Sequence, residues 1–138
     1  PLRLYIDSSY LDTSKNQAVA SFIKNRIMKN VKKVFEKMLK VKRIINPLKF
    51  DQKKCSDVDI PSYLNKDGAG VNADIIIIAT LDETGYFRQE RIEAAAIHCV
   101  QNKVNGRPVL GFIQFQEELL FDDSTEEYMV WLAIHEIT

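Results

Sequence analysis

The stretch ADIIIIATL, residues 73–81, constrains the fold more than any other part of this 138-residue chain. Its core is a run of four isoleucines, and polar residues stand only at its margins. β-Branched side chains favour extended backbone, and a strand that is apolar on both faces must be covered on both. Such strands belong to parallel sheets that helices cover. We therefore expect a central buried strand in a domain that combines helices with a sheet.

A long amphipathic helix is predicted over residues 14–41. Apolar residues recur there at three- and four-residue steps, and lysines occupy the other face. The apolar series is Val19, Phe22, Ile23, Ile27, Val31, Val34, Phe35 and Met38. The members that we expect to pack against the sheet are Phe22, Ile23, Val31, Val34, Phe35 and Met38.

Further segments complete the predicted fold. Residues 2–9 alternate apolar and polar side chains before a serine-rich turn, which predicts a strand. Residues 93–100 and 107–115 are also strand-like. Residues 42–50 contain a proline and predict an edge strand, and the turn-rich residues 51–72 predict an irregular surface loop. The expected class is α+β with α/β character.

Charge is unevenly distributed although the net charge is zero. Residues 24–54 carry twelve Lys and Arg against two acidic residues, and residues 57–138 carry fifteen Asp and Glu against five basic residues. A basic block can bind nucleic acid or anionic lipid, or it can be the solvated face of a helix. Because no aromatic interleaving or nucleic-acid motif accompanies it, we favour the solvated face and expect no nucleic-acid partner.

A second helix is predicted over residues 122–138. Ser124 and Glu127 have the spacing of a capping box at its start. The side chains that then share one helical face are Tyr128, Trp131, Leu132 and His135. We expect Trp131 to be buried and His135 to point inward beside it.

His135 and Glu136 are the residues best suited to chemistry. In the H-E-x-x-H motif, two histidines four positions apart bind one zinc ion, and the glutamate acts as general base. Ile137 and Thr138 take the two spacer positions here, and the second histidine would be the residue after Thr138. Alone the dipeptide is a weak signal, and an ordinary helix histidine is the alternative.

The chain has two cysteines, Cys55 and Cys99. In an exported protein an even number favours a disulfide, whereas in an intracellular protein both would be reduced thiols. The residues alone leave both states open. His98 precedes Cys99, but nothing else with ligand spacing stands nearby, so we expect His98 to be structural.

Several spaced segments together resemble one enzyme family. GVNADIIIIATL, AAAIHC, GRPVLGFIQF and a helix that ends AIHEIT follow one another within residues 68–138. The leishmanolysin family of zinc metallopeptidases shows a Gly-Val-x-x-Asp strand, an Ala-rich segment ending in Cys, a Gly-Arg-Pro-x-x-Gly strand and the zinc helix in this order. The opening PLRLYIDSS also resembles the strand that begins the catalytic domain of that family.

This resemblance implies a zinc-dependent endopeptidase with a metzincin-like N-terminal subdomain. Residues 1–138 would be a single partial domain with a twisted mixed sheet, a long backing helix and the active-site helix beneath the cleft. His135 would be a zinc ligand and Glu136 the general base, with the remaining ligands downstream. We therefore expect this chain alone to bind Zn²⁺ weakly or not at all and to be inactive.

The resemblance also implies a Cys55–Cys99 disulfide in a monomeric protein that is extracellular or on the cell surface, where an anchor outside this chain could hold it to a membrane. Peptides or proteins would be its substrates. In metzincins a strand before the zinc helix forms the upper rim of the cleft, where extended substrate adds as a further strand. Our candidates for this rim are Gly111, Phe112 and Ile113.

Two alternatives without catalysis remain open. The basic helix could make the domain a binding module for anionic surfaces, or a pseudo-protease adhesion domain could keep the fold without the metal. A histidine after Thr138 would favour the enzyme. A residue there that cannot bind a metal would favour the pseudo-protease.

Overall fold

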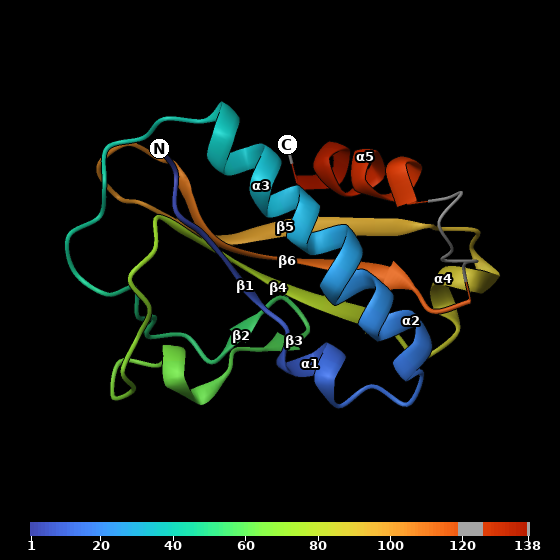
Figure 1. Cartoon of the computed structure of the whole chain (residues 1–138). Helices are drawn as coiled ribbons and strands as arrows, with labels where there is room; N and C mark the ends of the chain where they lie inside the picture. The colour runs from blue at the N-terminus through green and yellow to red at the C-terminus, as the bar shows by residue number, and fades with distance from the viewer. Residues whose placement is uncertain (119–125, 138) are drawn as a thin grey trace.

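A four-stranded mixed sheet forms the centre of the computed structural model, which describes residues 1–118 and 126–137 (Figure 1). Its strands are β1 (Leu4–Asp7), β4 (Ile75–Asp82), β5 (Ala94–Gln101) and β6 (Pro108–Gln116). The spatial order is β1-β4-β6-β5; β1, β4 and β6 run parallel, and β5 is antiparallel at the edge. The four strands predicted from the sequence are thus confirmed, as is the mixed α and β class.

β4 is buried on both faces, as its composition predicts. Ile76 and Ile78 face one side of the sheet and Ile77 and Ala79 the other, and none of the four is more than 4% exposed. One hydrophobic cluster forms on each face of the sheet as a result. The isoleucine run therefore contributes side chains to both hydrophobic cores.

Helices cover one face of the sheet (Figure 1). The long predicted helix is one rod built of α2 (Gln17–Phe22), a π-helical segment (Ile23–Met28) and α3 (Lys29–Met38). Beside it on the same face lies α5 (Glu126–Ile137), which packs against the rod and against β5. The two helices and the sheet enclose the larger of the two cores.

Most of the predicted helix contacts form, with one error. Buried members of the predicted set are Ile23, Val31 and Phe35, and half-buried members are Phe22 and Val34. Met38 is 72% exposed, so its predicted packing is wrong. The helix ends there, because Leu39 already has extended backbone (φ −109°, ψ 135°). The π-helical segment, which was not predicted, buries Ile27 and Met28 together on the core side.

The second face of the sheet is covered by irregular chain rather than by helices. Residues 42–50 form isolated bridges and no strand, so the predicted edge strand is wrong. Residues 51–72 contain a short hairpin, β2 (Lys54–Cys55) and β3 (Val58–Asp59), and a 3₁₀ turn at Ser62–Leu64. The side chains that residues 42–72 bury against the sheet are Leu48, Phe50, Cys55, Ile60 and Leu64. This segment is a packed cover and not only a surface loop.

Two short helices complete the described chain: α1 (Ser9–Asp12) after β1, and α4 (Tyr86–Gln89) after β4. α4 begins directly after its N-cap residue, Gly85, whose φ of 84° lies in the left-handed region that glycine adopts without strain. Within residues 1–118 and 126–137, no helix is both long enough and apolar enough to cross a bilayer.

Candidate functional site

α5 positions the His-Glu pair, and its contacts fix which of its faces points inward. Met129 and Ala133 are buried against the sheet and the long helix. Near its start, Glu126 pairs with Arg26 of the π-helical segment at 2.5 Å, and the Tyr128 hydroxyl donates to Glu93 at 2.5 Å. The predicted capping residue Ser124 lies outside the described residues.

The orientation of α5 corrects one prediction. Trp131 is 67% exposed, and His135, one helical turn later, is exposed on the same face. The two side chains do share a face, but it is the outer one. The reason is the helical period: residues two positions apart lie about 200° apart, so burial of Met129 and Ala133 turns Trp131 and His135 away from the core.

Glu136 lies at the flank of α5, half-buried, beside a groove of about 580 Å³. This groove lies between the ends of α3 and α5 and the sheet, and most of its lining is aliphatic or aromatic. Three titratable side chains also line it: His98, Arg107 and Glu136. The candidate base therefore lies between the exposed face of α5 and an apolar depression.

A catalytic zinc ion needs three protein ligands and an open position for water. Among the described residues, no group of three or more His, Cys, Asp or Glu side chains could hold a metal ion. The exposed imidazole of His135 suits one ligand position, and Glu136 beside it suits an outer-sphere base. The ring of His98 is instead 3.0 Å from the Gln101 side-chain amide. The described residues alone therefore do not form a complete zinc site.

The predicted substrate rim is wrong, because β6 is an inner strand. It pairs with β4 on one side and β5 on the other, so Gly111, Phe112 and Ile113 offer no open edge to a peptide. Ile113 is completely buried. Among the described strands, the one near α5 whose outer edge pairs with no other strand is β5.

Gly111 is required by the approach of β5 and not by a substrate. A Cβ at this position would lie 2.6 Å from the Ile97 carbonyl oxygen and 3.2 Å from His98 Cα. Opposite Gly111, the register of β5 against β6 shifts between His98 and Val100. Cys99 is the extra residue of this bulge.

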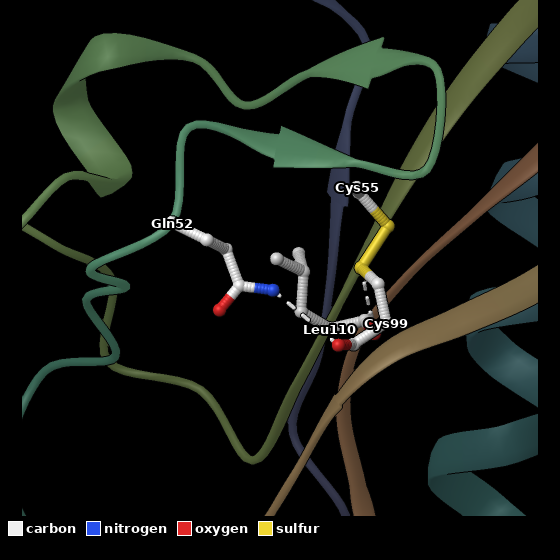
Figure 2. Close-up of a disulfide and its surroundings, with 4 residues drawn as sticks. All are labelled: Gln52, Cys55, Cys99 and Leu110. Carbon is white, nitrogen blue, oxygen red and sulfur yellow. Dashed lines mark hydrogen bonds between the residues drawn. A yellow bond between two sulfur atoms is a disulfide. The ribbon is translucent and has the colours of Figure 1, made fainter.

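The Cys55–Cys99 disulfide is present, with Cα atoms 5.4 Å apart (Figure 2). It joins the β2–β3 hairpin to the bulge of β5, and therefore fixes the irregular cover to the edge strand. The Gln52 side-chain amide strengthens this junction by donating to the Cys99 carbonyl at 3.3 Å.

Buried carboxylates at the strand ends were not singled out by the sequence. Asp7, at the end of β1, accepts hydrogen bonds from the Ser9 hydroxyl at 2.6 Å and from the Tyr63 hydroxyl. Burial, and then the hydrogen bond to Asp7, raise the pKa of Tyr63. Asp82, at the end of β4, accepts the backbone N–H of Phe87 at 2.7 Å. Because their oxygens accept hydrogen bonds within the protein, we assign a structural role to Asp7 and Asp82.

Asp74 accepts hydrogen bonds from two segments distant in the sequence. It is completely buried, forms an ion pair with Arg3 at 3.1 Å and accepts the backbone N–H of Ile44 at 2.9 Å. Burial acts to raise the pKa of Asp74, but these bonds outweigh burial and lower the pKa to about 2. Asp74 therefore stays charged and ties residues 3, 44 and 74 together. A polar residue that opens an otherwise apolar strand was the only sequence signal for it.

Comparison with known proteins identifies no family: no family model matches the chain, and no curated protein matches it.

Proposed function

We propose that this chain is part of a zinc-dependent endopeptidase, with His135 as a zinc ligand and Glu136 as the general base. The position of α5 carries the proposal. The helix that bears the His-Glu pair packs against β5, whose outer edge pairs with no other strand within residues 1–118 and 126–137. A peptide that extends along β5 would therefore run close to the two residues that the H-E-x-x-H chemistry requires.

A metzincin-like subdomain is the finer fold that we propose. Three features support it: a mixed sheet with an antiparallel edge strand, a long helix behind the sheet, and the His-Glu helix on the same face. The spaced segments that resemble leishmanolysins lie on β4, β5, β6 and α5. The resemblance thus falls on the elements that would build the cleft.

Each group has a defined role in the proposed reaction. Backbone N–H and C=O groups on the outer edge of β5 would hold the substrate extended, with its scissile carbonyl toward α5. The Glu136 carboxylate accepts a proton from the attacking water and transfers it to the leaving amine. Zinc, when bound, supplies polarisation of the carbonyl and a lower pKa for the water. His135 contributes one of the three protein ligands, so further ligands must come from outside the described residues.

The test uses a longer form of the protein that continues past Thr138 and includes downstream histidines. Glu136→Gln should retain zinc and lower peptide hydrolysis by about 10²–10⁴-fold, because only the base is lost. His135→Ala should lose the zinc as well. Glu127→Gln, an exposed glutamate on the same helix, is the matched control and should change neither property.

Undiminished turnover by the Glu136→Gln protein would contradict the proposal. So would a protein in which the residue after Thr138 cannot bind a metal, because the pseudo-protease adhesion domain would then be the better assignment. Chain 1–138 by itself should show no stoichiometric zinc in calorimetry, since one imidazole does not hold the ion against water.

A further inference from the structure

Two loops lie together at the end of the molecule where β1, β4 and β6 begin (Figure 1, left). One is residues 39–47, after α3, and the other is residues 102–107, between β5 and β6. Asp74 anchors both. Its carboxylate accepts the backbone N–H of Ile44 at 2.9 Å, and its backbone carbonyl accepts from Arg107 Nη1 at 3.0 Å. We call these two loops the docking tip.

Each loop of the docking tip displays an aliphatic side chain. Ile45 is 92% exposed and Val104 is 95% exposed. Their backbones are held by neighbouring bonds: the Ile44 carbonyl accepts from Arg3 at 2.6 Å, and the Val104 N–H donates to Asn102 Oδ1 at 2.8 Å. Two apolar side chains are therefore presented to solvent from anchored loops, where transfer out of water would be favourable.

Cations surround these side chains. Both loops lack Asp and Glu, and their exposed cationic side chains are Lys40, Lys42, Arg43 and Lys103. Within the described part of the chain, none of the four lies within 4.0 Å of a carboxylate. On the long helix, Lys24, Arg26 and Lys32 do form such pairs, whereas within the described residues Lys29, Lys33 and Lys37 do not. The positive charge of the docking tip is therefore uncompensated locally.

We propose that the docking tip binds an anionic lipid surface, independently of the proposed peptidase activity. Lipid headgroups complement the four cations, and the interface beneath them accepts Ile45 and Val104. A nucleic acid or a sulfated polysaccharide would engage the cations but would gain nothing from the exposed aliphatic side chains. The combination of both features in anchored loops favours a membrane over those polyanions.

Vesicle flotation with the chain described here tests the proposal through charge. The protein should bind vesicles of phosphatidylcholine with phosphatidylserine and not vesicles of phosphatidylcholine alone. Each cation near an anionic bilayer changes the partition constant by about fivefold, so Lys40→Gln/Lys42→Gln/Arg43→Gln should weaken binding by about a hundredfold. The control variant is Lys15→Gln/Lys29→Gln/Lys33→Gln, which loses the same charge at exposed lysines outside the docking tip. It should weaken vesicle binding by less than about tenfold.

A second pair of variants tests the apolar part. Ile45→Ser/Val104→Ser should weaken vesicle binding by at least about tenfold, because buried methylene groups are lost from the membrane. Tyr86→Ser should leave binding unchanged, because Tyr86 is 57% exposed and belongs to α4, which lies at the opposite end of the molecule (Figure 1). Heparin affinity of the Ile45→Ser/Val104→Ser variant should equal that of the original protein, since only the cations contact a polyanion.

Three results would overturn the proposal. The first is no binding to phosphatidylserine vesicles at low salt. The second is an equal loss for the tip and control charge variants, which would indicate attraction by overall charge. The third is unchanged vesicle binding by Ile45→Ser/Val104→Ser, which would make the tip a general polyanion site. Far-UV circular dichroism of every variant checks that the fold is retained.

Discussion

Replacement of Asp74 by asparagine should destabilise the protein by about 2–3 kcal/mol at neutral pH. Asp74 is completely buried, its carboxylate forms an ion pair with Arg3, and it accepts backbone N–H groups of Arg3 and Ile44 at 2.9 Å each. Asparagine keeps the size of the side chain but removes the charge and replaces one acceptor oxygen by a donor. The half-buried Arg3 guanidinium then loses its charged partner.

The magnitude follows from the pKa of the Asp74 carboxyl group. Burial acts to raise this pKa, yet the hydrogen bonds from Arg3 and Ile44 lower it from 3.8 to about 2. A change of one unit corresponds to about 1.4 kcal/mol. Because the pKa is lower in the folded state, the stabilisation is complete above the unfolded value of 3.8 and is lost as pH falls through about 2.

Urea unfolding followed by circular dichroism, from pH 7 down to pH 2, measures this difference. The free energies of unfolding of the original and Asp74→Asn proteins should differ by about 2–3 kcal/mol at pH 7 and converge near pH 2, where the original carboxyl is partly protonated. Asp67→Asn, at an exposed position, should change stability by less than about 0.5 kcal/mol. A deficit that is absent at pH 7, or equally large at pH 2, would refute the role assigned to the ion pair.

Three further changes test the packing of the fold. Phe35→Ala should lower the free energy of unfolding in urea by about 3–5 kcal/mol, because Phe35 is only 8% exposed and packs in the core. Lys33→Ala should lower it by less than about 0.5 kcal/mol. Equal losses would contradict the helix orientation. Thiol titration in denaturant without reductant should find no free thiol, because Cys55 and Cys99 are bridged. The two residues are 44 positions apart, so reduction of the bridge should lower the free energy of unfolding by about 3–4 kcal/mol. Two free thiols in material from an oxidising compartment would argue against the bridge. Gly111→Ala should lower the free energy of unfolding by about 1–3 kcal/mol, since its Cβ would lie 2.6 Å from the Ile97 carbonyl oxygen. Unchanged stability would mean that β5 moves away from β6 easily.

The hydrophobic pattern predicted the main helices and strands because their buried side chains recur at regular intervals along the sequence. Four isoleucines in succession can be satisfied only in a strand covered on both faces, and β4 is that strand. The three- and four-residue steps of residues 14–41 likewise predicted the long helix. The disulfide followed from the resemblance to a family, since two cysteines alone cannot show whether they pair.

Three features of the fold could not be predicted from local pattern. α5 carries apolar side chains around most of its circumference, so its period did not show whether Trp131 or Met129 would face the core. Sheet order depends on contacts between distant segments, so the inner position of β6 was not visible. Residues 42–72 bury Phe50 and Leu64 at irregular intervals, because the sheet and the Cys55–Cys99 bridge position this segment.

The roles of His135 and Glu136 stay predictions, whereas their geometry could be read only from the structure. His135 and Glu136 came from a motif whose chemistry demands that spacing. Their orientation depends on how α5 packs, and the rim depends on which strand has a free edge. Both depend on tertiary contacts, so the sequence could not show that β6 is an inner strand and that β5 is the edge strand beside α5 in the described part of the chain.

The position of zinc in the longer, zinc-loaded protein tests the proposed peptidase site most directly. Anomalous X-ray scattering at the zinc edge should locate one ion with a ring nitrogen of His135 at about 2.0–2.1 Å. The carboxylate of Glu136 should lie outside the first coordination sphere, within reach of the metal-bound water. A zinc ion bound elsewhere, or one ligated by Glu136 and not by His135, would contradict the proposed site.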